Sequence, residues 1–223
     1  MQQEEKSNVN LNGADLHMHT NYSDGVFEPF ALLQKVKKTG LEIVSITDHD
    51  NVDAIDEAID AGNELNIEVI PGVELSVTVG DRDIHLLGYF FDYKNSELLE
   101  YLTFAREQRY NRALRIIEKL HAIDIPLDFD DVLAFAGKGS ICRTHIAKAL
   151  LRNKFVQTFQ ESFAKYIGFG QPAYEEKKTL SIKDAIALIN EAGGLTFIAH
   201  PGKNFSESIF HQLIDDGIDG IEV

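Results

Sequence analysis

A chain of 223 residues, 44% of them hydrophobic, can bury a core in one domain or in one domain with an insertion. Its formal net charge of −15 excludes a protein that binds long nucleic acid over its whole surface. The single cysteine, Cys142, excludes an internal disulfide, and nothing in the composition indicates an oxidising compartment.

The sequence carries no pattern typical of export or membrane insertion. Residues 1–10 are polar and acidic, and they lack the cationic start and apolar stretch of a signal peptide. No apolar run approaches the roughly 20 residues that a membrane span needs. We therefore expect a cytoplasmic protein that makes no contact with a membrane.

The first 94 residues alternate between strand and helix patterns. Strands are predicted over residues 13–20, 41–50, 67–77 and 82–91, and helices over 28–40, where the pattern stops at Gly40, and 51–66. A β-α-β-α alternation is typical of parallel strands covered by helices, so we expect an α/β fold.

The pattern changes over residues 95–178, which show no strand of comparable strength. Helices are predicted over residues 95–124 with Ser96 as N-cap, 142–153 and 158–168. The alternation then resumes, with a helix over 181–194 that begins at Ser181 and ends at Gly193, and strands over 195–202 and 217–223. We therefore expect a helical insertion within an α/β domain.

Charge is distributed unevenly along the chain. From Lys138 to Lys178 there are eight lysines and arginines against three glutamates, on an otherwise acidic body. This segment favours a small anionic ligand; the alternative is a solvated helix face of mixed charge.

Asp15, His17 and His19 occupy alternate positions of the first predicted strand, directly before a Ser-Asp-Gly turn. Alternate residues of a strand point to the same face. Imidazoles are the commonest metal ligands near neutral pH, so two of them on one face favour a metal site.

Other polar residues lie at or near the predicted strands: Asp24, Asp48, His49, Glu74, His85 and His200. The carboxyl ends of parallel strands share one face of an α/β protein, so we expect these side chains to meet in one pocket. Imidazoles together with carboxylates suit Mn, Fe or Zn better than Ca or Mg, and there are enough of them for more than one ion. Two or three adjacent ions suit phosphoester hydrolysis by a metal-activated hydroxide.

Seven motifs occur in order along the chain: DLHMHTNYSDG, ITDHD, PGVE, DIHLLGY, CRTHIAKAL, QPAY and AHPG. Together they resemble the PHP (polymerase and histidinol phosphatase) family, and the resemblance extends over residues 14–223. It implies a distorted (β/α)7 TIM-like barrel with an inserted helical subdomain and a trinuclear metal site. The barrel would comprise residues 1–94 and 179–223, and the inserted cap would comprise residues 95–178.

The resemblance also implies residue roles. The metal ligands would be His17, His19, Asp24, His49, Glu74, His85 and His200. Asp15 and Asp48, and also Asp50, would orient these ligands from behind. Arg143 and His145 match a motif of the insertion that contacts phosphate, and Lys177 is our choice for a lysine that the family carries after PAY, with Lys178 as the neighbouring alternative.

The implied function is that of a metal-dependent phosphoesterase. Its substrate would be a nucleoside 3′,5′-bisphosphate or a short 5′-phosphorylated RNA, and its cofactors up to three divalent ions, manganese first, with iron or zinc as alternatives. Arg143 and Lys177 would neutralise charge on the phosphate, and His145 could protonate the leaving oxygen. The alternatives are a phosphatase of a small metabolite such as histidinol phosphate, an amidohydrolase, and a catalytically silent metal-binding module.

The sequence departs from the family pattern in one respect. The family's site ends with an Asp-x-His pair on a late strand, and no such segment follows IDGIEV in this sequence. We therefore expect a truncated barrel in which the metals held by that pair are loosely bound.

Overall fold

The structure, a computed structural model, describes residues 13–79, 82–202 and 207–223. Residues 1–10, on which the signal-peptide prediction depends, lie outside them. The strands are β1 (Ala14–Met18), β2 (Ile43–Ile46), β3 (Glu68–Val79), β4 (Arg82–Tyr89), β5 (Leu180–Ser181), β6 (Leu195–Ile198) and β7 (Gly220–Ile221). The helices are α1 (Pro29–Thr39), α2 (Ile55–Leu65), α3 (Ser96–His121), α4 (Phe129–Ala136), α5 (Arg143–Arg152), α6 (Phe159–Ser162), the π-helix η1 (Phe163–Ile167), α7 (Ile182–Glu191) and α8 (Glu207–Asp215).

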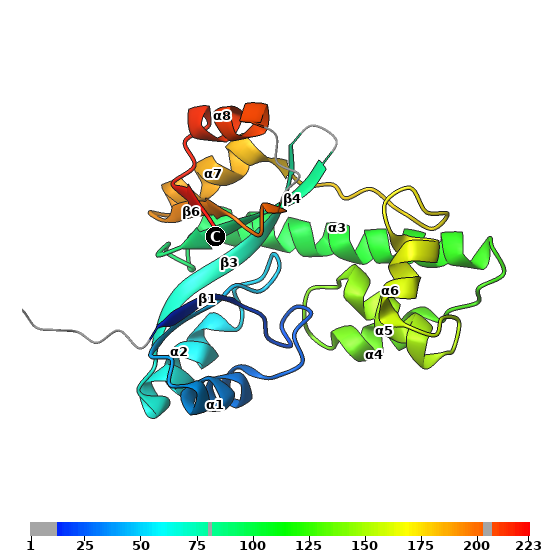
Figure 1. Cartoon of the computed structure of the whole chain (residues 1–223), viewed down its shortest axis with the longest axis horizontal. Coiled ribbons are helices and arrows are strands. Elements are labelled where there is room, and N and C mark those ends of the chain that lie inside the picture. The colour runs from blue at the N-terminus through cyan, green and yellow to red at the C-terminus, as the bar shows by residue number, and fades with distance from the viewer. Residues whose placement is uncertain (1–12, 80–81, 203–206) are drawn as a thin grey trace, which may run out of the picture.

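The strands form one curled, mixed sheet (Figure 1). Its order is β1-β2-β3-β4-β6-β7, and β5 pairs with β3. In the described part of the chain this sheet is open, with β1 and β7 at its two edges, so the expected barrel takes the form of a half-barrel. Strands β1, β2 and β3 are parallel, as the alternating pattern predicted.

The prediction of parallel strands was wrong for β4, which runs antiparallel to both β3 and β6. Only two residues separate Val79 at the end of β3 from Arg82 at the start of β4. A parallel neighbour needs a crossover connection of a dozen or more residues, so strands this closely joined pair as a hairpin. The antiparallel register of β4 with β3 determines which residues of β4 lie opposite each residue of β3.

The main core lies on the outer face of β3 and β4. Val73, Leu75 and Val77 alternate along β3 and are fully buried, together with side chains of α3 and α7. The intervening residues of β3, Glu74 and Ser76, therefore point to the concave face of the sheet. Helices α1 and α2 cover the β1–β2 side with a smaller apolar cluster (Figure 1).

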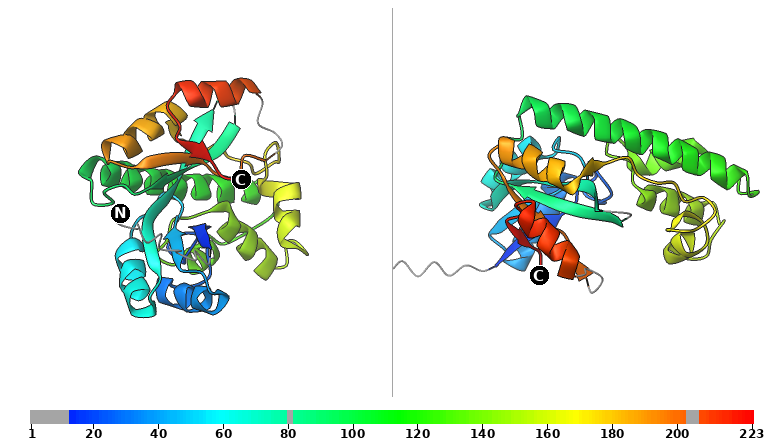
Figure 2. Two further views of the ribbon diagram at one scale, coloured as in Figure 1. Left: turned by 60° about the vertical axis from the view of Figure 1, so that its left-hand side comes forward. Right: turned by 90° about the horizontal axis from the view of Figure 1, so that it is seen from above.

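A second core forms among the helices between β4 and β5. Its members include Ile116, Leu120, Ile146 and Leu150, which come from α3 and α5. Helix α3 joins the two cores, since its first half packs on the sheet and its second half on α4–α6 (Figure 2). The N-cap of α3 is Asn95, one residue before the predicted Ser96, because the Asn95 side chain accepts the backbone N–H groups of the first turn.

Two other predicted helix ends agree with the structure, whereas α2 begins at Ile55 rather than Asn51, and the helix predicted over 158–168 is divided into α6 and the π-helix η1. Gly40 ends α1 in the left-handed conformation, and the Ser181 hydroxyl accepts the Asp184 N–H at the start of α7. Among the described residues, none of the helices combines the length and the apolar character that crossing a membrane requires.

Candidate metal centre

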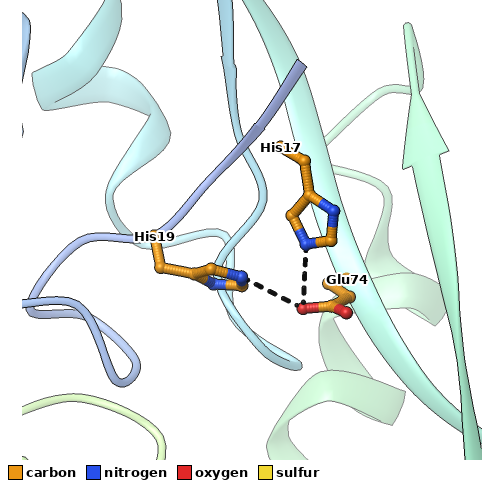
Figure 3. Close-up of side chains that lie close together, drawn as sticks. All are labelled: His17, His19 and Glu74. Carbon is orange, nitrogen blue, oxygen red and sulfur yellow. Dashed lines mark ion pairs between the residues drawn. The ribbon is translucent and has the colours of Figure 1, made fainter. Parts of the chain in front are cut away.

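Glu74 stands at the centre of the concave face, fully buried in the middle of β3. Five imidazoles approach its carboxylate, at nitrogen–oxygen distances of 3.4 Å for His17, 3.2 Å for His19, 2.9 Å for His49, 2.7 Å for His85 and 3.2 Å for His200. Figure 3 shows the first two of these contacts, which converge on one carboxylate oxygen. One carboxylate therefore connects imidazoles from four segments that are far apart in the sequence.

The sheet explains this convergence. His17 lies in β1, His19 directly follows it, and His49 follows β2, where a parallel bridge links it to Glu74. These positions, and that of His200 after β6, agree with the expected gathering at strand ends.

Glu74 and His85 do not follow that rule, because both lie within their strands. His85 faces Ser76 across the antiparallel β3–β4 pair. Because Ser76 and Glu74 share the concave face of β3, this register brings the His85 side chain to Glu74. The β3–β4 hairpin, which was not predicted from the sequence, therefore places His85 beside Glu74.

Asp24 adds a carboxylate on the side of the centre nearest the Ser-Asp-Gly turn. Its Oδ1 lies 3.9 Å from His19 Nδ1 and 4.0 Å from His49 Nε2. Three overlapping groups of possible ligands result: His17–His19–Glu74, His19–Asp24–His49 and His49–Glu74–His85. His19, His49 and Glu74 each belong to two groups.

Some of the buried nitrogen and oxygen atoms of this cluster have no hydrogen-bond partner. His49 Nδ1, His85 Nδ1 and Glu74 Oε2 are buried and make no hydrogen bond, although both imidazole nitrogens lie within 2.9 Å of the Glu74 carboxylate. Buried polar atoms left in this state are costly unless a further partner satisfies them. A set of imidazoles and carboxylates with unused lone pairs fits divalent transition-metal ions.

The pKa values of the cluster are shifted both by burial and by the contacts between the imidazoles and the Glu74 carboxylate. Burial would raise the pKa of Glu74, but the surrounding imidazoles, His17 first, hold it far below its usual range. Burial would lower the pKa of His17, but Glu74 and then Glu222 raise it to about 9, whereas burial lowers the pKa of His49 to about 4. Some imidazoles thus carry protons beside Glu74 and others do not, and a bound cation would displace those protons.

Two of the three aspartates predicted to support the ligands, Asp48 and Asp15, make different contacts near them. Asp48 is buried and accepts hydrogen bonds from Thr20 and from the Ser23 hydroxyl, which in turn lies 3.3 Å from His19 Nδ1. Asp48 therefore holds the turn that carries His19 and Asp24. Asp15 accepts the backbone N–H of His17 at 3.2 Å, within β1 itself.

The helical segment reaches the centre through α5. Lys148 donates to the Asp24 carbonyl at 3.1 Å, which fixes α5 against the turn. His145 is fully buried and its Nδ1 accepts the Cys142 N–H, while its Nε2 makes no hydrogen bond. Burial lowers the pKa of His145 to about 4. Arg143 lies in the same turn and donates to the Ile167 carbonyl at 3.3 Å.

The two candidate lysines have different surroundings. Lys177 donates to the Ser76 hydroxyl at 2.9 Å, two residues along β3 from Glu74, and helps burial to lower the pKa of His85. Lys178 is exposed, and both lysines line a pocket of about 580 Å³ together with Arg115 and Thr179. Of the two, Lys177 is the one whose ammonium contacts the concave face.

Two features of the site were missed from the sequence. Glu222, directly after β7, accepts from His17 Nδ1 at 3.1 Å and from the His200 N–H at 2.6 Å. Its place after a short strand is the same signal that identified the other candidates. Arg109 of α3 is buried and donates to Asp50 at 2.6 Å and to Ser76 at 2.8 Å; no sequence signal distinguishes it from the other arginines of α3.

This chain is similar to several known proteins. A 5′-3′ exoribonuclease of Haemophilus influenzae is 35% identical over 94% of this chain and 78% of its own length. A 3′,5′-nucleoside bisphosphate phosphatase of Chromobacterium violaceum is 33% identical over 94% of this chain and 75% of its own length. A solved structure from Bifidobacterium adolescentis, described as a metal-dependent phosphoesterase, has a TM-score of 0.87 and 32% identity over 94% of this chain and 76% of its own.

These names confirm the predicted enzyme class, a metal-dependent phosphoric ester hydrolase. The family model for the PHP domain matches residues 15–192, a range that begins just before His17 and extends through α7. The chain therefore belongs to the PHP domain family.

Proposed function

We propose that this chain is a metal-dependent phosphoesterase that hydrolyses nucleoside 3′,5′-bisphosphates or short 5′-phosphorylated RNA. It would use up to three divalent ions, manganese first and iron or zinc as alternatives. The proposed ligands are His17, His19, Asp24, His49, Glu74, His85 and His200. Bound ions would supply Lewis acidity toward phosphate oxygens and an activated water as nucleophile.

One observation supports this proposal above the others: five imidazole nitrogens lie within 3.4 Å of a single buried carboxylate. A structural role does not account for this arrangement, because five partly desolvated imidazoles around one carboxylate cannot all be satisfied by it. The two oxygens of Glu74 face different imidazoles, Oε2 that of His49 and Oε1 that of His85, so the carboxylate would be available to more than one ion.

The chain's own cations would hold the phosphate. Arg143, at the start of α5, can bind two phosphate oxygens through its guanidinium fork, and Lys177 adds a point charge beside β3. His145 accepts a hydrogen bond at Nδ1, so its neutral ring carries a proton on Nε2 and would donate a hydrogen bond to a phosphate oxygen there. These groups come from residues 95–178, which we propose to be a helical cap subdomain with a core of its own.

Two relatives are named for activity on RNA or on a nucleoside bisphosphate, which favours a nucleotide substrate over a small metabolite. The net charge of −15 disfavours long nucleic acid, whereas the cationic groups of the cap suit a ligand of one or a few nucleotides. A phosphatase that acts on a small metabolite would need fewer of the cationic groups of the cap to bind its substrate.

The test is phosphate release from adenosine 3′,5′-bisphosphate in the presence of Mn²⁺. Wild type should release phosphate, His49→Ala should lose at least 100-fold in rate, and His211→Ala, an exposed histidine of α8, should match wild type. Release from histidinol phosphate alone would favour the metabolite phosphatase. No release from folded, metal-loaded protein would favour a silent metal-binding module.

A further inference from the structure

An aromatic and cationic cluster lies beside the α5 turn that faces the metal centre. The Arg143 guanidinium lies 5.8 Å from the ring centroid of Phe163 and 5.9 Å from that of Tyr174. The Arg112 guanidinium lies 5.9 Å from the same Tyr174 ring, and Phe169 contacts that ring edge to face at 5.4 Å. Phosphate-binding cations with aromatic rings between them are typical of sites for single nucleotides or single-stranded nucleic acid.

Phe169 is the exposed member of this cluster, with 78% of its surface open to solvent. Its single edge-to-face contact leaves most of the ring uncovered. A lone exposed aromatic residue needs no explanation. Here, however, the ring extends a cluster that begins at Arg143, and Arg143 belongs to the helix that Lys148 ties to Asp24.

The backbone presents Phe169 in a fixed turn. The Gln171 N–H donates to the Gly168 carbonyl, and Gly170 adopts φ +74°, so Phe169 and Gly170 are the central residues of a β-turn. A side chain at Gly168 would clash with the Phe163 carbonyl, with its Cβ only 2.3 Å from the oxygen. The turn is anchored on the other side by the Ala173 N–H, which donates to the Tyr166 carbonyl at 2.9 Å. An apolar ring held outward by such a turn is preorganised for a ligand.

We propose that the Phe169 ring, backed by Tyr174, is a stacking platform for the base of a nucleotide whose phosphate is bound by Arg143. A nucleotide carries a flat base and an anionic group within one monomer. The cluster offers a matching pair of groups, because Tyr174 contacts both the Arg143 guanidinium and the Phe169 ring. Stacking reads the presence of a base and not its identity, because every base has a π-face. This inference rests on the proposed function. It assigns to Phe169 the discrimination between nucleotides and phosphate esters that lack a base.

The experiment compares kcat/KM for adenosine 3′,5′-bisphosphate and for the same bisphosphate without its base. Phe169→Ala should lower kcat/KM for the nucleotide by about 5- to 150-fold and change that for the abasic compound less than about 2-fold. Phe169→Trp should restore the nucleotide value and Phe169→Leu should not. Phe104→Ala, an aromatic residue of α3 that is 47% exposed, is the matched control and should change neither.

A binding measurement supplements the kinetics. Stacking quenches the fluorescence of 2-aminopurine, so its 3′,5′-bisphosphate should be quenched by wild type and by Phe169→Trp but not by Phe169→Ala. Equal losses on both substrates, or no loss on either, would overturn the stacking role of Phe169. A wild type that hydrolyses neither substrate would instead refute the proposed function.

Discussion

His17 Nδ1 and Glu222 Oε1 lie 3.1 Å apart, although 205 positions separate the two residues in the sequence. The contact joins the two edges of the curled sheet, since His17 belongs to β1 and Glu222 follows β7. It also fixes the ring of His17, whose Nε2 then faces Glu74 at 3.4 Å. A carboxylate behind a histidine in this way sets the tautomer and the direction of the coordinating nitrogen.

Removing this support should weaken metal binding without removing a ligand. Glu222→Ala is expected to lower the affinity for Mn²⁺ by about 10- to 100-fold, because His17 loses its orienting partner. Calorimetric titration measures this affinity. Glu207→Ala, an exposed glutamate of α8, is the control and should bind as wild type does. An unchanged affinity in Glu222→Ala would show that the contact does not orient His17.

The Asp50–Arg109 pair should be a major source of stability. Both side chains are buried, and Arg109 also donates to Cys142 Sγ at 3.2 Å and to the Ile141 carbonyl at 3.3 Å. Arg109→Met should lower the free energy of unfolding by about 3–5 kcal/mol, because it leaves Asp50 buried without its partner. Arg106→Met breaks a more exposed pair with Asp53 and should cost at most about 1 kcal/mol. Urea denaturation of both variants decides whether this difference exists.

The same pair predicts a pH dependence of stability. Burial would raise the pKa of Asp50, but Arg109 and then Lys177 lower it from 3.8 to about 2. A carboxylate with a depressed pKa stabilises the fold above its unfolded pKa and loses that contribution as pH falls through the folded value. Wild type should therefore lose stability relative to Asp50→Asn between about pH 4 and pH 2. Parallel stability curves for the two proteins over this range would contradict the assignment.

Cys142 should be unreactive in the folded protein. Burial raises the pKa of its thiol to about 11, and the thiolate is the reactive form. At pH 8 a disulfide reagent should therefore modify Cys142 slowly in native protein and rapidly in urea. Rapid modification of the native protein would mean that the start of α5 opens in solution.

The sequence predicted the chemistry of the site better than its scaffold. The alternate spacing of Asp15, His17 and His19 predicted a face of candidate ligands without any knowledge of the fold, because strand geometry alone dictates which residues share a face. The antiparallel direction of β4 was missed because the strand–helix alternation outweighed the short link between Val79 and Arg82. Hairpin geometry, not strand-end position, places His85 beside Glu74.

Glu222 and Arg109 show two different limits of sequence reasoning. Glu222 followed a recognisable strand and could have been chosen by the rule that identified His49 and His200. Arg109 lies among several arginines of α3, and only the packing of α3 against β3 and the Cys142 turn distinguishes it. Its role depends on tertiary contacts that no local pattern encodes.

In the proposed site, Glu74 and the five surrounding imidazoles would together bind several divalent ions. The most direct test is the metal content of protein dialysed against Mn²⁺ and analysed by mass spectrometry, for wild type, Glu74→Gln and His211→Ala. Wild type and His211→Ala should retain more than one equivalent, and Glu74→Gln should lose most of it, because the amide cannot carry the charge shared between ions. A wild type that retains no metal would refute the metal centre, and a Glu74→Gln variant that retains all of it would refute the role of Glu74 in it.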